Sequence, residues 1–356
     1  MSGGVDSSVA AALAADEHGR DQVVGATLKL WGGASDSGCC SVADVEDARR
    51  VAGQLGLVHH VFNFTDTFGE KVVAPYVAGH ASGRTPNPCI ECNRHLKFDR
   101  LLDRARALGF DAVATGHHAR RAVTPGGRYR LLRGADPAKD QSYVLAMLGQ
   151  RQLALSLFPV GTMDKAQVRQ EAARLGLRTA DKPDSQDVCF IRSDQGREAF
   201  LADRVPLHPG RLVDHASGRD LGPVGAVELV TVGQRRGMGH GVDGRRRYVT
   251  AVDVPARRVS VGPPEAAESV GSRLCSVRWV DGDPTAGRSC GPSRSCEVLA
   301  QCSAHGRPVP ATVRGEDDGS LSVRFSSPQR RVAPGQTVAL YDPCDPDAVL
   351  GSGIVD

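Results

Sequence analysis

The first residues of the chain have the types and the spacing of a phosphate-binding loop. The run Ser2-Gly3-Gly4-Val5-Asp6-Ser7-Ser8 leads directly into an apolar pattern of helical spacing. Its glycines let backbone N–H groups approach an oxyanion, its serine hydroxyls add donors, and the helix N-terminus supplies positive partial charge. The run therefore predicts a phosphate site, and a glycine-rich helix cap without a ligand is the simpler alternative.

Two other nucleotide-binding patterns fail on their context. No Gly-Lys-Ser/Thr sequence occurs in the chain, so the loop is not of the Walker A type. Gly239, Gly241 and Gly244 match the G-x-G-x-x-G pattern of dinucleotide-binding folds. The run 245–249 that follows them is typical of a strand, whereas that pattern requires a helix. We therefore discard a dinucleotide site.

Cysteines are the second group of residues that could do chemistry. Cys92 follows Cys89 at C-x-x-C spacing. Sulfur carriers need a thiolate, because a persulfide forms and releases sulfur by thiolate exchange. Inert burial is one alternative, and a zinc or iron–sulfur site is another, although no second C-x-x-C pair completes four ligands. The neighbours of Cys92 include side chains that favour a thiolate if they also lie close in space: Arg94, His95 and Lys97.

The first part of the chain must position these residues, and it alternates helical and strand patterns. Apolar residues recur at helical spacing in residues 5–13, 45–55 and 98–108, and strand-like runs occupy 23–30, 60–62 and 112–115. Such alternation is typical of βαβ units. We therefore predict an α/β fold with a doubly wound, mostly parallel sheet over residues 1–205.

The pattern of apolar residues changes from helical spacing to short alternating runs at about residue 206. Short alternating runs at 227–232, 248–254 and 258–261 are separated by glycine and proline, and the same style returns at 321–325 and 338–341. These runs predict two small β-rich domains, over residues 206–265 and 266–356, the last one a β-barrel. Residues 281–295, rich in Gly, Pro and Ser, are expected to form a loop.

Composition limits the class of protein. The net charge of +3 is too small to identify a nucleic-acid binder, and basic clusters such as 245–247 fit either a nucleic-acid surface or an ordinary solvated one. The apolar stretches are too short to cross a bilayer, and the start of the chain lacks the features of a secretory signal. The ten cysteines then indicate a reducing compartment, so we expect a cytoplasmic protein without a membrane partner.

Two levels of family resemblance emerge from these motifs. The run from Ser2 to Ser7 resembles the pyrophosphate loop of the N-type ATP pyrophosphatases, which cleave ATP to AMP and pyrophosphate. The segments around Cys92 and Cys189 resemble the signature cysteines of the tRNA-specific 2-thiouridylases. The resemblance extends over nearly the whole chain through further motifs: residues 115–117, 139–143, 158–161, 231–237 and 334–336.

The resemblance implies an activity and its partners. This family makes 2-thiouridine at position 34 of the tRNAs for Lys, Glu and Gln, through transfer of AMP onto the base and sulfur transfer from a cysteine persulfide. The implied cofactors are ATP and Mg²⁺, and the implied sulfur source is a persulfide donor such as a cysteine desulfurase. Cys189 would carry the persulfide, and Cys92 would be the partner nucleophile that resolves it through a transient disulfide.

The resemblance also assigns the binding residues, and it implies no resident metal site. The ATP-contacting positions would be Ser2, Gly3, Gly4, Val5, Asp6, Ser7, Leu28 and Gly116. Asn87, Pro88 and Cys89 would lie beside the target base. The other tRNA-contacting positions would be His117, Lys139, Asp140, Gln141 and Gln336. There are simpler alternatives for three of these positions. Lys139 and Gln141 could be ordinary surface residues, and His117 could cap the end of a strand.

The sequence departs from the family pattern in three places. Relatives have an apolar strand directly before the Ser-Gly-Gly turn, so the first strand of the sheet is missing here; we expect a translation start farther upstream and a poorly stable 356-residue form. Some relatives have Asp at the position of Cys89. Because this chain has a third cysteine there, an iron–sulfur enzyme with Cys89, Cys92 and Cys189 as ligands is an alternative. An Arg-Tyr pair contacts tRNA in some relatives, and this chain has Ser303 and Ala304 near the corresponding position.

Two other functions compete with this prediction. One is another ATP-pyrophosphatase tRNA thiolase, and the other is an inactive tRNA-binding paralogue.

Overall fold

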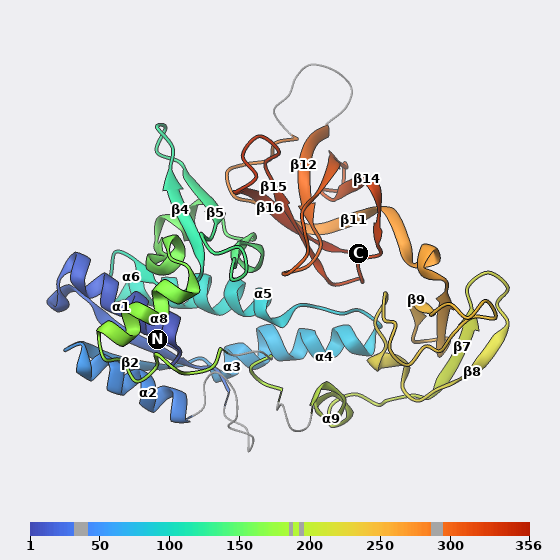
Figure 1. The fold of residues 1–356 in the computed structure, drawn as a ribbon, viewed down its shortest axis with the longest axis horizontal. Coiled ribbons are helices and arrows are strands. Elements are labelled where there is room, and N and C mark those ends of the chain that lie inside the picture. The colour runs from blue at the N-terminus through green and yellow to red at the C-terminus, as the bar shows by residue number, and fades with distance from the viewer. Residues whose placement is uncertain (32–41, 185–187, 192–195, 286–294) are drawn as a thin grey trace.

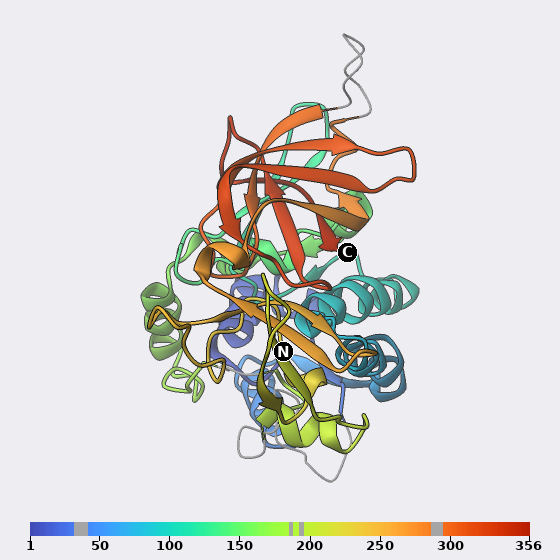
Figure 2. The ribbon, with the colours of Figure 1, turned by 90° about the vertical axis from the view of Figure 1, so that its right-hand side faces the viewer.

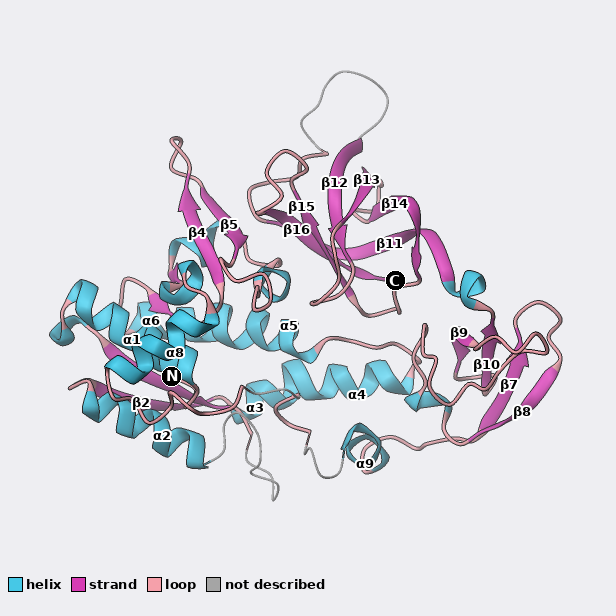
Figure 3. Cartoon of the chain, viewed as in Figure 1, coloured by secondary structure: helices cyan, strands magenta, loops and turns pink. Residues whose placement is uncertain are grey.

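The computed structural model describes residues 1–31, 42–184, 188–191, 196–285 and 295–356. Helices are concentrated in the first part of the chain, and strands form the two later parts (Figure 3). The helices are α1 (Val5–His18), α2 (Val42–Gln54), α3 (Thr65–Phe68), α4 (Ala74–Ala81), α5 (Pro88–Cys92), α6 (Leu101–Ala107), α7 (Gln150–Ala154), α8 (Lys165–Arg174) and α9 (Gly196–Ala202). Short 3₁₀ turns lie at Arg20–Gln22, Ser142–Leu145, Pro159–Thr162, Val227–Leu229 and Pro264–Ala267.

The first part has the predicted α/β character. Strands β1 (Val24–Lys29) and β2 (Val58–Asn63) pair in parallel, as do the short strands β3 (Val113–Ala114) and β6 (Ser156–Leu157). Among the described residues these are two separate parallel pairs rather than one continuous sheet. Helix α1 packs against α2 and α8 through a core of small and branched apolar side chains that includes Val9, Val51 and Val168. The sheet edge and this helix layer together position the start of α1.

Two long helical stretches cross the middle of the molecule (Figure 1). A π-helical segment, Gly69–Val73, continues α3 into α4, and another, Asn93–Arg100, continues α5 into α6. The predicted helix over 98–108 is therefore the second half of a stretch that begins at Pro88. Such π segments occur often at functional sites. Cys92 stands where α5 passes into its π segment.

The middle part is a small sheet of strand order β8-β7-β10-β9. Its strands are β7 (Gly210–Asp214), β8 (Asp220–Val224), β9 (Tyr248–Asp253) and β10 (Arg258–Gly262). The predicted strand over 227–232 is wrong, because Val227–Leu229 forms a 3₁₀ turn. This turn places Val227 in the core and lets the Glu228 carboxylate accept hydrogen bonds from the backbone and ring of His208.

The last part is the predicted β-barrel. Its strands are β11 (Glu268–Trp279), β12 (Ser295–Gln301), β13 (Val309–Gly315), β14 (Leu321–Arg330), β15 (Thr337–Tyr341) and β16 (Ala348–Val355). They follow the order β11-β14-β13-β12-β15-β16, and β11 pairs again with β16 to close the antiparallel ring. Figure 2 shows the barrel standing above the helices. Of the predicted loop over 281–295, residues 286–294 lie outside the described residues, and Ser295 already belongs to β12.

A hairpin of the first part extends the barrel sheet. Strands β4 (Ala119–Val123) and β5 (Tyr129–Arg133) pair with each other, and β5 continues onto β16 through Leu131 and Leu132. This hairpin was not among the predicted elements. The barrel sheet thus includes two strands from the first part of the chain. The domain boundaries at 1–205, 206–265 and 266–356 therefore stay a prediction.

Candidate active site

The turn at the start of α1 has the geometry of an anion-binding loop. Gly3 has a left-handed backbone (φ +73°), and a Cβ there would lie 2.4 Å from the Asp44 carbonyl oxygen, so only glycine fits. Gly4 is the N-cap of α1, and no side chain caps the helix. The Ser7 hydroxyl instead donates to the Gly4 carbonyl and accepts from the Ser2 backbone N–H, at 3.0 Å in both cases. The capping alternative therefore loses its main support.

Gly116 closes the loop from the other side. It follows β3, and a Cβ at this position would lie 2.5 Å from the Ser7 backbone nitrogen. The chain after β3 therefore runs directly against the first turn of α1. Gly116 therefore lies beside the loop, its predicted contact with the nucleotide stays a prediction, and Val5 is buried as the first residue of α1.

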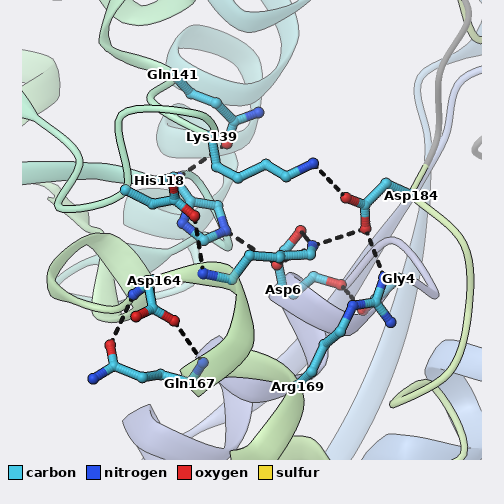
Figure 4. A network of polar contacts seen from close by, with 12 residues as sticks. Gly4, Asp6, His118, Lys139, Gln141, Asp164, Gln167, Arg169 and Asp184 are labelled. Atoms are coloured by element: carbon cyan, nitrogen blue, oxygen red, sulfur yellow. Dashed lines mark hydrogen bonds and ion pairs between the residues drawn. The ribbon is translucent and has the colours of Figure 1, made fainter.

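A chain of ion pairs joins this loop to the segment that precedes Cys189 (Figure 4). The Lys165 ammonium contacts both carboxylate oxygens of Asp6, at 2.7 and 2.8 Å, and an Asp184 oxygen at 2.8 Å. Asp184 also accepts from Lys139 at 2.8 Å and from Arg169 at 3.2 Å. His118 contacts Asp6 through Nε2 at 3.1 Å.

The charges of this network favour an anion. Burial raises the pKa of Asp184, but hydrogen bonds from Lys139 and Lys165 outweigh it and bring the pKa down to about 2. Burial also opposes ionisation of Asp6, yet hydrogen bonds from His118 and Lys165 leave its pKa lowered. Both carboxylates are therefore ionised at neutral pH. Lys139, Lys165 and Arg169 each contact one of these carboxylates, so three cationic side chains stand beside the loop and could turn toward a phosphate.

No sequence pattern predicted the parts of Lys165, Arg169, His118 and Asp184 in this network. Lys165 carried a signal, because it is the first residue of α8, after an Asp164 cap that accepts from the Gln167 N–H at 2.8 Å. A cation at a helix N-terminus is disfavoured by the helix dipole. A lysine at that position therefore indicates a partner elsewhere, which is the Asp6–Asp184 pair.

The two predicted catalytic cysteines belong to one apolar cluster. Cys92 is 8% exposed and packs in a cluster with Leu96 and Phe190, against which Cys189 and Leu28 also pack. Both thiol segments and Leu28 thus lie against the same apolar cluster, and a single pocket that also includes the turn at residues 2–8 stays a prediction. Among the described residues no disulfide links these cysteines. Cys89, in the first turn of α5, is exposed.

Helix α5 has a well-formed start that fixes the residues before Cys92. The Asn87 side chain accepts from the backbone N–H groups of Cys89 at 3.1 Å and Ile90 at 3.4 Å. Pro88 is buried at the first helical position, where its missing N–H costs nothing. Asn87 and Pro88 thus shape the helix that presents Cys89 and Cys92.

The residues predicted to contact tRNA have partners inside the protein. The Asp140 side chain is only 7% exposed, and its carboxylate accepts from Arg133 at 2.6 Å and from the Ser142 hydroxyl at 2.9 Å. The Gln141 side chain accepts from the His118 backbone N–H at 2.9 Å. The Gln336 side-chain amide donates to the Thr85 carbonyl.

His117 is a buried ring rather than an exposed contact. Its Nδ1 lies 2.8 Å from the Thr115 hydroxyl, and its ring packs between Phe98 and Phe158 at centroid distances of 5.5 and 6.4 Å. Burial, together with the nearby charge of Lys97, holds the pKa of His117 well below its usual range. His117 is therefore neutral at physiological pH.

The ranges 1–31, 42–184, 188–191, 196–285 and 295–356 contain no group of three or more His, Cys, Asp or Glu side chains placed to hold a metal ion. Cys89, Cys92 and Cys189 are thus not gathered as an iron–sulfur ligand set. The stretch 185–187 of the Cys189 motif lies outside the described residues. In the described part of the chain, every helix is too short or too polar to cross a membrane.

Comparison with protein families defines the class first. Residues 1–193 match the model described as "tRNA methyl transferase HUP domain". Residues 198–263 match "tRNA methyl transferase PRC-barrel domain", and residues 271–355 match "Aminomethyltransferase beta-barrel domain". The chain is therefore an α/β HUP-domain protein with a middle PRC-barrel domain and a C-terminal antiparallel β-barrel.

Individual relatives then give the family. A "tRNA-specific 2-thiouridylase MnmA" of Mycolicibacterium smegmatis is 47% identical, over 98% of this chain and 95% of the relative. Proteins of the same name are 44% identical in Chloroflexus aggregans, over 99% and 96%, and 46% identical in Salinispora tropica, over 100% and 97%. The chain belongs to the tRNA-specific 2-thiouridylase family, which confirms the predicted resemblance.

Proposed function

We propose that this protein thiolates C2 of the wobble uridine, U34, of tRNA in an ATP-dependent reaction. Two structural observations support the proposal. Cys92 and Cys189 share one apolar cluster, and the Asp6–Lys165–Asp184 ion pairs join the loop to the segment before Cys189. Family membership supplies the acceptor, because the relatives are named for 2-thiouridylation of tRNA.

The nucleotide site would use the loop and its cationic neighbour. Backbone N–H groups of residues 2–7 and the hydroxyls of Ser2 and Ser7 would bind the ATP phosphates, with Gly116 and Leu28 beside the nucleotide. Lys165, which bridges two carboxylates, is placed to exchange one of them for a phosphate oxygen. ATP supplies the AMP group that makes the uridine C2 oxygen a leaving group. We expect Mg²⁺ to enter with the phosphates and to neutralise the departing pyrophosphate.

The thiols would carry the sulfur. The terminal sulfur of a Cys189 persulfide attacks C2, and AMP departs with the former C2 oxygen. The Cys92 thiolate then attacks the Cys189 sulfur and breaks the sulfur–sulfur bond, which leaves sulfur on the base and a Cys92–Cys189 disulfide. A second route, in which Cys92 first releases sulfide from the persulfide, gives the same products. In both routes an external thiol reduces the disulfide, and a persulfide donor such as a cysteine desulfurase reloads Cys189.

The remaining assignments concern the tRNA and the compartment. Asn87, Pro88 and Cys89 would lie beside the flipped target base, which must leave its stack to reach the pocket. We expect the tRNAs for Lys, Glu and Gln as substrates, with Lys139 and Gln141 near the anticodon loop. Because Asp140 and His117 are enclosed, we assign them the shaping of that surface. The thiol chemistry fits a reducing, cytoplasmic location.

The proposal is tested with tRNA, ATP, Mg²⁺ and a cysteine desulfurase. Mass spectrometry of the digested nucleosides should reveal a sulfur-for-oxygen mass increase at uridine 34. Cys189→Ala and Cys92→Ala should each abolish it, because each removes a sulfur that the transfer requires. Cys344→Ala is the matched control, since Cys344 is exposed on the barrel and far in sequence from both segments.

Three outcomes would contradict this assignment. Unchanged thiolation in the Cys189→Ala variant would remove the persulfide carrier. Release of pyrophosphate without any thiolated base would indicate a different acceptor. Tight tRNA binding without pyrophosphate release would indicate the inactive tRNA-binding alternative.

A further inference from the structure

The residues just before α5 lie where the three parts of the chain meet. We refer to Gly83–Pro86 as the junction loop. Its contacts with the barrel run through the backbone: the Thr85 N–H donates to the Pro334 carbonyl at 2.7 Å, and the Gln336 amide donates to the Thr85 carbonyl. The Arg84 guanidinium adds a bond of 3.0 Å to the Val355 carbonyl.

Close backbone approach makes this barrel contact specific. Gly335 has a left-handed backbone (φ +88°), and a Cβ there would lie 3.1 Å from the Pro86 nitrogen and 3.2 Å from Thr85 backbone atoms. A larger residue would therefore push the junction loop away from the barrel. Gln336 is the next residue after Gly335. Its side chain therefore reaches Thr85 from a turn whose backbone already touches the junction loop.

The other sides of the junction loop are also held. The Thr85 hydroxyl lies 3.4 Å from that of Thr231 in the middle part, and a Cβ on Gly83 would lie 3.2 Å from Val254. The Arg84 N–H donates to the Gly79 carbonyl at 2.9 Å, which ties the loop back to α4. Barrel, middle part and α4 thus all fix the same few residues.

The junction loop leads directly into the helix that carries Cys92. Its next residue, Asn87, caps α5, and Cys92 is the last residue of that helix. A shift of the barrel relative to α4 would therefore move the start of α5, and Cys92 with it. A displacement of about 1 Å is enough to change a reaction rate strongly, because reacting atoms must meet in a narrow geometry.

We propose that Gln336 is a positioning residue that couples the docked barrel to Cys92 through Thr85. This deepens the proposed function and rests on it. The family resemblance predicted Gln336 as a tRNA contact, whereas its side-chain amide is directed at the protein backbone. The barrel, once it carries bound tRNA, would then hold the junction loop and set the position of α5.

The test separates positioning from tRNA binding. We compare Gln336→Ala and Gln336→Glu, which lose the donated hydrogen bond, with Gln329→Ala as the control. Gln329 is a partly exposed barrel glutamine whose side-chain amide donates to the carbonyl and the hydroxyl of Ser327, two residues earlier in the same strand. We expect both Gln336 variants to lower kcat for 2-thiouridine formation about tenfold at saturating tRNA and ATP. The tRNA Kd, measured by filter binding, should stay within about twofold of wild type.

A second readout does not require turnover. Cys92 alkylation by iodoacetamide, followed on its peptide by mass spectrometry in the absence of tRNA, should be faster in both Gln336 variants than in Gln329→Ala, with melting temperatures compared in parallel. A weaker tRNA Kd with unchanged kcat and alkylation would show direct tRNA contact and overturn the proposal. Wild-type behaviour in all readouts would overturn it too. If the wild-type protein itself forms no 2-thiouridine, the proposed function fails, while the alkylation rates still decide the positioning role.

Discussion

His80 shows how one buried side chain links stability to pH. It is 2% exposed on α4 and packs edge-on against Tyr76, with a ring-centroid distance of 4.7 Å. Burial, and to a smaller extent the Arg197 guanidinium, lower the pKa of His80 to about 4, although a bond to the Glu228 backbone opposes this. Its Nε2 has no hydrogen-bond partner in the described part of the chain. The folded protein therefore holds this imidazole in its neutral form.

This burial predicts acid destabilisation in a defined window. The unfolded chain binds the proton near pH 6.5 and the folded chain only near pH 4. Stability from the neutral ring is therefore fully present above pH 6.5 and is lost as the pH falls toward 4. His80→Gln should flatten this loss, as measured by urea midpoints at a series of pH values. The exposed His305→Gln is the control, and equal pH profiles for the wild-type and His80→Gln proteins would contradict the prediction.

At the scale of elements, the end of β3 approaches the first turn of α1 at the proposed phosphate site. Strands and helices of this kind follow from local patterns, because apolar periodicity determines which face is buried. Their approach distance does not, because it depends on backbone atoms that are far apart in sequence. Gly116 marks that distance, since it touches the backbone between Asp6 and Ser7.

Gly116→Ala should therefore damage the nucleotide site. A Cβ 2.5 Å from the Ser7 nitrogen must push α1 and β3 apart, and overpacking of this kind costs about 1–3 kcal/mol. We expect the KM for ATP to rise about tenfold or more, measured by pyrophosphate release with saturating tRNA. Gly53→Ala is the matched control, because an added Cβ on α2 meets nothing within 4 Å. An unchanged KM for ATP in Gly116→Ala would count against the loop as the phosphate site.

At the scale of the whole molecule, the barrel is joined to the first part by a shared sheet and by Arg133. The β5–β16 pairing continues the barrel sheet into the hairpin. Arg133 lies over the Tyr341 ring, with 3.8 Å from its guanidinium carbon to the ring centroid, and donates to Gln301 at 2.8 Å. The same guanidinium pairs with Asp140, whose side chain is only 7% exposed. Two parts of the chain therefore share one buried polar cluster.

Arg133→Met should weaken the whole fold. It leaves the enclosed Asp140 carboxylate without its cation, and such a loss costs about 3–5 kcal/mol. We expect a lower urea midpoint for both parts together, followed by circular dichroism and by tryptophan fluorescence. Arg324→Met is the control, because Arg324 lies on the outer face of β14. A normal midpoint in Arg133→Met would show that the shared cluster does not hold the parts together.

The sequence by itself determined most element types of the described residues, the family, and which loop and thiol segments are candidates for the site. These depend on local features: apolar spacing, glycines at a turn, and cysteines in family motifs. It did not give the β4–β5 hairpin or its pairing with β16, nor the Val227–Leu229 turn, where the Glu228 carboxylate bonds the distant His208.

Only the tertiary structure decided which residues share the site. Lys165 and Asp184 are nearly twenty positions apart, and neither has a signature of its own that assigns it to the loop at residue 6. Gln336 looks like a surface contact in the sequence, yet its amide reaches Thr85 across the junction of three parts. The physical reason is that charge pairing and backbone contact depend on distance in space, whereas a sequence pattern reports only distance along the chain.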